Sequence, residues 1–174
     1  HCTLSKIFDD IIVTSNDARV KALTKATNAQ FHQRAEHLCQ DQTPPESVVL
    51  DVINSYRLKS DDIVFYIQPT TPFRRSQDLR AILEILRSGQ NNSVVGVRKN
   101  QFSPFKSFTV GHDDCLTPLF SEEITNQRRQ ELPDTFSATG GFYAFTISRF
   151  QKKNKFPSQN AASFLLEFPY DIDV

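Results

Sequence analysis

Short apolar runs alternate with segments of helical periodicity over the first hundred residues. Residues 63–67, Ile-Val-Phe-Tyr-Ile, are apolar at every position, residues 9–15 contain Ile-Ile-Val, and residues 94–97 contain three valines. Runs this short and apolar on both faces are typical of strands buried inside a sheet. Residues 29–32 form a further short run. The pattern predicts four strands in this part of the chain.

Three segments between these runs repeat their apolar residues at helical spacing. Asn16 and Asp17 can cap the first, Pro44 and Pro45 suit the first turn of the second, and Ser76 can cap the third, which Gly89 ends. The inward positions are Val20, Leu23, Thr24 and Thr27, then Val49, Val52, Ile53 and Tyr56, then Leu79, Ile82, Leu83 and Leu86. Alternating strands and helices require parallel pairing with helical crossovers. We therefore expect an α/β fold with a mainly parallel sheet.

The pattern changes after Lys99. Residues 100–120 alternate loosely between turn signals and predict a β-hairpin outside the main sheet. Residues 121–131 form a charged helical segment with almost no apolar face, while residues 142–146 return to a buried strand. Phe102, Phe105 and Phe108 alternate in a way that suits a dimer interface. We expect residues 100–131 to be a dimerisation arm inserted into one domain that spans residues 1–174.

Composition excludes several classes of protein. Twenty basic residues balance twenty acidic ones in 174, so no basic field points to nucleic acid. No run approaches the length of a membrane span, and no signal peptide is apparent. Three widely spaced cysteines without a CxxC pattern favour reduced thiols in a cytoplasmic protein. The chain begins at His1 and contains no Met, so we expect native sequence upstream of it.

The segment after residue 67 is the strongest candidate for a binding site. Gln68 and Pro69 end the strand, because proline cannot donate to a sheet ladder. The threonines and prolines of residues 69–72 form a stiff loop with hydroxyl groups, closed by Arg74 and Arg75. Ligands of open α/β sheets bind beyond the carboxyl ends of strands, which is where this loop must lie.

Seven stretches, in order, resemble the acylneuraminate cytidylyltransferases. Residues 8–16 are similar to the family's "fd-IiVSTD", residues 34–41 to "RPxxLAxD", and residues 68–74, Gln-Pro-Thr-Thr-Pro-Phe-Arg, to "QPTSPLR". The others are residues 104–106, 129–133, 140–143 and 171–173. Each stretch alone is weak, but together they cover nearly the whole chain.

This resemblance implies a fold and a reaction. The fold is the Rossmann-like, three-layer α/β/α type of the nucleotide-diphosphosugar transferases, in a homodimer. The reaction joins CTP to a nine-carbon α-keto acid sugar, of the sialic, legionaminic or pseudaminic acid type, and releases pyrophosphate. It requires positioning and charge neutralisation more than covalent catalysis. Biosynthesis of surface polysaccharide is the usual destination of the product in this family.

The resemblance also implies roles for individual residues. Arg34 corresponds to an arginine near the cytidine, and Gln68 to the glutamine that holds the acceptor sugar. Lys106 and Arg129 correspond to catalytic basic residues that contact the sugar acid or the phosphates. This contact can be with the substrates of the same chain or, across a dimer interface, with those of the partner chain. Asp171 and Asp173 correspond to Mg²⁺ ligands, and carboxylate oxygens are the donors that Mg²⁺ prefers. Further substrate-binding candidates are Thr70, Thr71, Arg74, Thr139 and Gly140.

The sequence departs from the family pattern at several positions. The glycine-rich and basic loop that cradles the triphosphate is absent from these residues, so we expect it upstream of His1. Asn16, Pro45 and Thr139 stand where the family usually has Asp, a small hydroxyl residue and Asn. The register of the aspartate pair is also open, because a further Asp after Val174 would shift it.

Two alternatives remain from the sequence. The first is a cytidylyltransferase for the eight-carbon acid Kdo. The second is an inactive domain that dimerises and binds nucleotide sugars, which the missing triphosphate loop favours. A third class, a small-molecule-binding module, would not need the acidic pair at residues 171 and 173.

Overall fold

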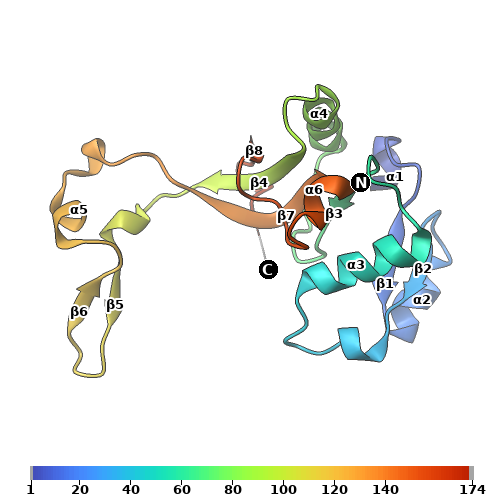
Figure 1. Ribbon diagram of the computed structural model, residues 1–174, viewed down its shortest axis with the longest axis horizontal. Helices are drawn as coiled ribbons and strands as arrows, with labels where there is room; N and C mark the ends of the chain where they lie inside the picture. Colours follow the sequence, from blue (N-terminus) through green and yellow to red (C-terminus); the bar gives the residue numbers. More distant parts are fainter. Residues whose placement is uncertain (1, 173–174) are drawn as a thin grey trace.

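The computed structural model describes residues 2–172 as a sheet covered by helices, with a long arm on one side (Figure 1). The main sheet has four strands in the order β3-β7-β4-β8. They are β3 (Ile63–Tyr66), β4 (Ser93–Lys99), β7 (Phe136–Thr146) and β8 (Ala162–Leu165). β4 and β8 are parallel, while β7 runs antiparallel to both β3 and β4. Three of the four strands therefore point the same way.

A second, two-stranded parallel sheet precedes it. β1 (Ile12–Ser15) pairs with β2 (Gln30–Gln33), and α2 (Ala18–Thr24) connects them as a crossover. The N-cap of α2 is Asp17, whose carboxylate accepts from the Arg19 backbone N–H at 2.7 Å, as the sequence predicts. The predicted inward face is wrong at Leu23, which is 72 % exposed, and at Thr27, which is exposed and lies beyond the end of α2.

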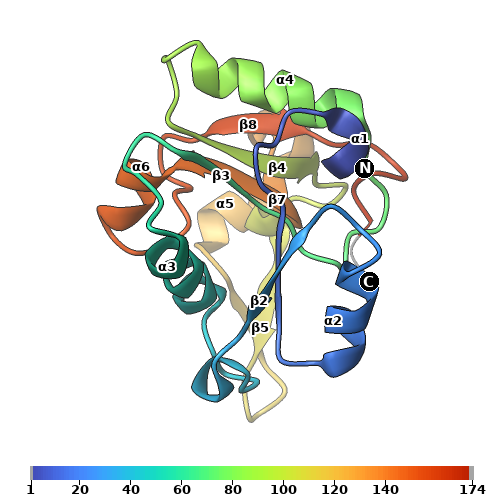
Figure 2. The ribbon, with the colours of Figure 1, turned by 90° about the vertical axis from the view of Figure 1, so that its right-hand side faces the viewer.

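Helices cover both faces of the main sheet, so the fold has three layers with the sheet in the middle (Figure 2). α4 (Ser76–Arg87) packs Ile82 and Leu86 against Val94 and Ala144 on one face. On the other face, α3 (Pro45–Tyr56) and α6 (Ile147–Gln151) enclose a core that includes Phe145. The α/β/α fold predicted from the sequence is confirmed. Short helices complete the body: α1 (Cys2–Ser5) beside α4, and the 3₁₀ turn η1 (Glu36–Leu38).

Two local predictions are corrected. The residue that caps α4 is Arg75, and Ser76 is the first residue of the helix. The run at residues 63–67 is predicted to lie inside a sheet, yet β3 is an edge strand whose four residues are only half-buried. β7 pairs with one edge of β3, and among the described strands none pairs with the other edge.

The arm leaves the body through the paired ends of β4 and β7. Arg98 opposes Ser137, Lys99 opposes Phe136, and Asn100 N–H donates to the Thr135 carbonyl at 2.9 Å. Beyond this neck lie η2 (Pro104–Lys106), the predicted hairpin of β5 (Phe108–Val110) and β6 (Leu116–Pro118), α5 (Glu122–Asn126) and η3 (Arg129–Glu131). The helix predicted over 121–131 is thus two short pieces. Figure 1 shows the arm extended away from the sheet.

Candidate active site

The loop after β3 is held together by Arg74. Its Nη2 donates to the Gln68 carbonyl and to the Thr71 hydroxyl, and that hydroxyl also donates to the Gln68 carbonyl at 3.1 Å. Thr71 is buried by these contacts, whereas Thr70 is exposed on the outside of the loop. Burial lowers the pKa of Arg74, although an arginine stays protonated in proteins. The guanidinium organises the loop from within.

The loop lies over an irregular stretch of β7. Between the pairs Val95–Tyr143 and Val97–Ala138, β4 contributes only Gly96 while β7 contributes residues 139–142. Thr139 donates from Oγ1 to the Gly96 carbonyl at 3.2 Å and accepts from Gly141 N–H at 3.2 Å. Gly140 has φ +71°, a conformation that glycine adopts without a steric penalty. The Thr-Gly-Gly sequence therefore builds a bulge in the middle of the sheet.

The bulge faces the loop at Gly141. A Cβ on Gly141 would lie 3.9 Å from Cγ2 of Thr71 and 3.2 Å from Oγ1 of Thr139. A side chain at Gly141 would therefore be tight against Thr139 within the bulge, while Thr71 of the loop lies at an ordinary contact distance. The structure brings six of the predicted substrate-binding residues into one region: Gln68, Thr70, Thr71, Arg74, Thr139 and Gly140. Thr139 is 3 % exposed and uses its hydroxyl on backbone groups, so its observed contacts are structural.

The Gln68 side chain lies beside a group of aromatic rings. Its Nε2 donates to the Tyr66 hydroxyl at 3.4 Å. Tyr66 and Tyr143 are cross-strand partners, and the Phe156 ring centroid is 4.7 Å from that of each tyrosine. Burial, followed by the nearby Glu46 and Tyr66, raises the pKa of Tyr143. Sequence analysis missed these aromatic residues; the spacing of Tyr66 and Gln68, which places both on one face of an extended strand, was the available signal.

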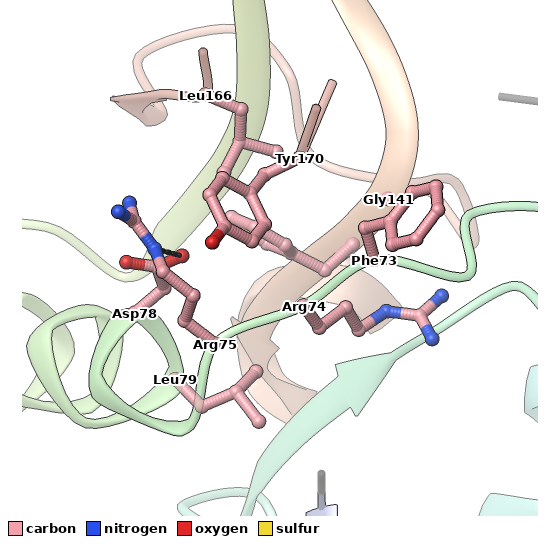
Figure 3. A pocket seen from close by; sticks show the side chains of 9 residues that line it. Phe73, Arg74, Arg75, Asp78, Leu79, Gly141, Leu166 and Tyr170 are labelled. Carbon is pink, nitrogen blue, oxygen red and sulfur yellow. Dashed lines mark hydrogen bonds and ion pairs between the residues drawn. The ribbon is translucent and has the colours of Figure 1, made fainter. Parts of the chain in front are cut away.

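A second set of contacts fixes the segment after β8 against the same loop. Arg75 lies over the Tyr170 ring at 4.3 Å and pairs through Nε with the Asp78 carboxylate at 2.9 Å. Figure 3 shows these side chains around a small pocket that Phe73, Leu79, Gly141 and Leu166 also line. The Arg74 guanidinium points away from this pocket in the same view. The segment that contains Tyr170 and Asp171 therefore lies beside the loop after β3.

The predicted metal pair is only partly visible. Asp171 lies half-buried in the turn after β8, and Asp173 lies outside the described residues. Over residues 2–172, no group of three or more His, Cys, Asp or Glu side chains gathers as a metal centre would. A carboxylate such as Asp171 has the donor chemistry that Mg²⁺ takes.

Arg34 lies at the end of the two-stranded sheet. Its Nη2 donates to the Thr14 carbonyl at 2.9 Å, and its Nε lies 3.5 Å from the Thr14 hydroxyl. The side chain therefore ties the end of β2 to the end of β1. Its predicted role near cytidine stays a prediction.

Lys106 and Arg129 lie on the arm rather than beside Gln68 (Figure 1). The Lys106 ammonium donates to the carbonyls of Thr125 at 2.7 Å and Gln127 at 2.5 Å. It therefore anchors η2 to the end of α5. Arg129 is exposed and lies 5.7 Å from the Phe102 ring centroid. Within one chain the structure does not bring these two residues to the candidate site.

The fold is α/β, and the loop at the end of β3 is its candidate ligand site. This chain belongs to the cytidylyltransferase family, whose model matches residues 2–167. It is 26 % identical over 172 residues to an N-acylneuraminate cytidylyltransferase of Oncorhynchus mykiss. That match covers 98 % of this chain but 39 % of the relative, so the chain spans about two fifths of the relative's length.

A solved structure shows the same fold. It is CMP:2-keto-3-deoxy-manno-octonic acid synthetase complexed with CTP, with a TM-score of 0.58 and 14 % identity. The alignment covers 90 % of this chain and 72 % of that one. The three cysteines are free thiols, and over residues 2–172 no helix is long and apolar enough to cross a membrane.

Proposed function

We propose that this chain is the cytidylyltransferase domain of an enzyme that activates a nonulosonic acid with CTP. The oxygen of the acceptor's anomeric hydroxyl forms a bond to the α-phosphorus of CTP. The bond from that phosphorus to pyrophosphate breaks, and the hydroxyl proton is released. The products are the CMP-sugar and pyrophosphate. The observation that carries the proposal is the Gln68–Arg74 loop, which Arg74 holds at the end of β3 facing the Thr139–Gly141 bulge, in a chain of the cytidylyltransferase family.

Within this proposal, residues of the body bind the substrates. The Gln68 amide meets the sugar acid, Arg34 lies toward the cytidine, and Thr70 offers an exposed hydroxyl at the same loop. Asp171 with Asp173 would hold Mg²⁺, which when bound neutralises charge on the phosphates. The Arg75–Tyr170 contact supports this placement, since it holds the segment before Asp171 against the loop.

The arm supports a homodimer. None of residues 100–138 is buried, so the arm has no core of its own. Several of its large apolar side chains are exposed: Phe102, Phe108, Val110, Leu116, Leu119, Phe120 and Phe136. Such a surface is typical of a protein–protein contact, and a second copy is the partner that the family resemblance implies. Sedimentation equilibrium measures this directly; a monomer throughout the micromolar range would contradict it.

Pyrophosphate release with CTP and Mg²⁺ tests the activity. Sialic, legionaminic and pseudaminic acids and Kdo are offered in parallel, to the 174-residue chain and to the complete product of its gene. We expect release with one nine-carbon acid. Release with Kdo alone would replace the acceptor class by the eight-carbon acid, the substrate named for the structural neighbour. Folded protein that releases pyrophosphate with none of the four acids would support the inactive binding domain instead.

A further inference from the structure

The side chain of Gln68 is held before any ligand arrives. Its Nε2 donates to the Tyr66 hydroxyl at 3.4 Å, although Gln68 stands beyond the end of β3 and is half-buried. A free glutamine side chain has several rotatable bonds, and ordering it at the moment of binding costs affinity. A partner that fixes the amide in the free protein removes part of that cost.

Tyr66 is well suited to this task because its own ring is fixed. It contacts the Phe156 ring at a centroid distance of 4.7 Å and lies opposite Tyr143 across the β3–β7 pair. Phe156 stacks in turn on Tyr143, at 4.7 Å and an interplanar angle of 19°. The three rings are partly buried and pack against the core cluster beneath α3 and α6. The hydroxyl is therefore presented from a rigid base.

The chemistry of the hydroxyl matches the amide. A phenol both donates and accepts, so it can hold either end of the Gln68 amide and still offer one further hydrogen bond.

We propose that Tyr66 is a positioning residue for acceptor recognition: its hydroxyl holds the Gln68 amide in the orientation that meets the sugar acid. The inference rests on the proposed function, in which Gln68 contacts the acceptor. Tyr66 acts through Gln68 and takes no part in the chemical step.

The test is Tyr66→Phe, which removes the hydroxyl and keeps the ring packed against Phe156. It is made in the complete product of the gene and assayed with the acid, among the four named above, that gives the fastest release. We expect the KM for the acid to rise about three- to tenfold, the loss typical of one hydrogen bond. The KM for CTP, kcat and the melting temperature should stay unchanged. Tyr56→Phe is the matched control, because that ring packs against His32 instead.

A double-mutant cycle shows whether Tyr66 acts through Gln68. In a Gln68→Ala background, Tyr66→Phe should add no further rise in the KM for the acid. Additive effects would overturn the inference, since Tyr66 would then act on the substrate by itself. An unchanged KM in Tyr66→Phe, with a raised one in Gln68→Ala, would overturn it as well.

Two other results would overturn the proposed function rather than the positioning role alone. If Gln68→Ala leaves the KM for the acid unchanged, Gln68 does not bind the acceptor, and Tyr66 has nothing to position. If no acid of the four supports release, the transferase assignment fails, and the inference fails with it.

Discussion

Arg74 occupies the inside of the loop that defines the candidate site. Its guanidinium satisfies the Gln68 carbonyl and the Thr71 hydroxyl at once. Arginine presents several donors in a fixed plane, whereas lysine presents one compact charge on a flexible stem. A charged donor to a buried carbonyl is among the stronger hydrogen bonds in proteins. The shape of the loop therefore depends on this one side chain.

We predict that Arg74→Lys loosens the loop without unfolding the protein. The free energy of unfolding should fall by about 1–2 kcal/mol, the scale of one charged hydrogen bond in a half-buried place. Hydrogen exchange should speed up over residues 68–75. Arg87→Lys, on the exposed last turn of α4, is the control and should change neither quantity. Unchanged exchange in the loop of the Arg74 variant would contradict this role.

Gly96 stands opposite the bulge in β7 for a steric reason. A Cβ at this position would lie 3.0 Å from Cζ of Phe142 and 3.3 Å from Cδ1 of Leu166. Phe142 is only 3 % exposed and packs in the core beneath α4, so its ring has little room to move.

We predict that Gly96→Ala destabilises the fold by about 1–3 kcal/mol through overpacking. Urea unfolding measures the change. In a Phe142→Leu background, where the ring is gone, the same substitution should cost clearly less, because the two sites share one space. Equal costs in both backgrounds would show that the ring is not the obstacle.

At this scale the sequence indicated the loop but not its partners. The run from Gln68 to Arg74 could be found because proline, threonine and arginine follow a strand in a recognisable order. The contacts of Tyr66 with Phe156, and of Arg75 with Tyr170, join residues 90 and 95 positions apart. Only the fold brings such residues together, since no periodicity along the chain predicts contacts over this separation.

Elements with a strong local signal were predicted well. Asp17, Pro45 and Gly89 mark the ends of helices through capping and backbone conformation, which depend on a few adjacent residues. Burial depends on neighbours instead. β3 has the composition of a central strand but lies at an edge, and the charged segment 121–131 breaks because too few apolar contacts support a longer helix.

The N-cap of α2 leads to a prediction about pH. Hydrogen bonds from the Arg19 side chain, and then from its backbone N–H, lower the pKa of Asp17 to about 2. A carboxyl whose pKa is lower in the folded protein adds stability above its unfolded pKa of about 3.8, and that stability is lost as the pH falls toward 2.

Asp17→Asn keeps a capping side chain but removes the titration. The wild type should be the more stable protein at pH 5, and its advantage should shrink steadily between pH 4 and about pH 2. Thermal unfolding across this range measures the difference, and added salt should reduce it because the pair with Arg19 is exposed. An advantage that stays constant down to pH 2 would show that the charge is not responsible.

The predicted site residues lie in two separate parts of the molecule, the body and the arm. Gln68, Thr71 and Gly140 lie on the body, whereas Lys106 and Arg129 lie on an arm that extends away from it (Figure 1). The arm has exposed apolar side chains and no buried residue, so it gains most by contacting another chain. Lys106 already anchors the arm internally, while Arg129 is exposed beside the Phe102 ring. Sequence order alone could not reveal this separation, because it reflects where the neck between β4 and β7 directs the chain.

If Arg129 serves the site of the other copy, two inactive variants should rescue each other. Gln68→Ala and Arg129→Ala homodimers should each release little pyrophosphate, since each defect affects both sites. A refolded equimolar mixture should recover about a quarter of wild-type activity, because half of the dimers are mixed and each has one intact site under two-fold symmetry. Wild type refolded with the chain carrying both substitutions is the matched control: mixed dimers then have no intact site, and about a quarter of full activity should remain. If Arg129 acted within its own chain, the first mixture would stay inactive and the second would retain about half, so the pair of measurements distinguishes the two arrangements.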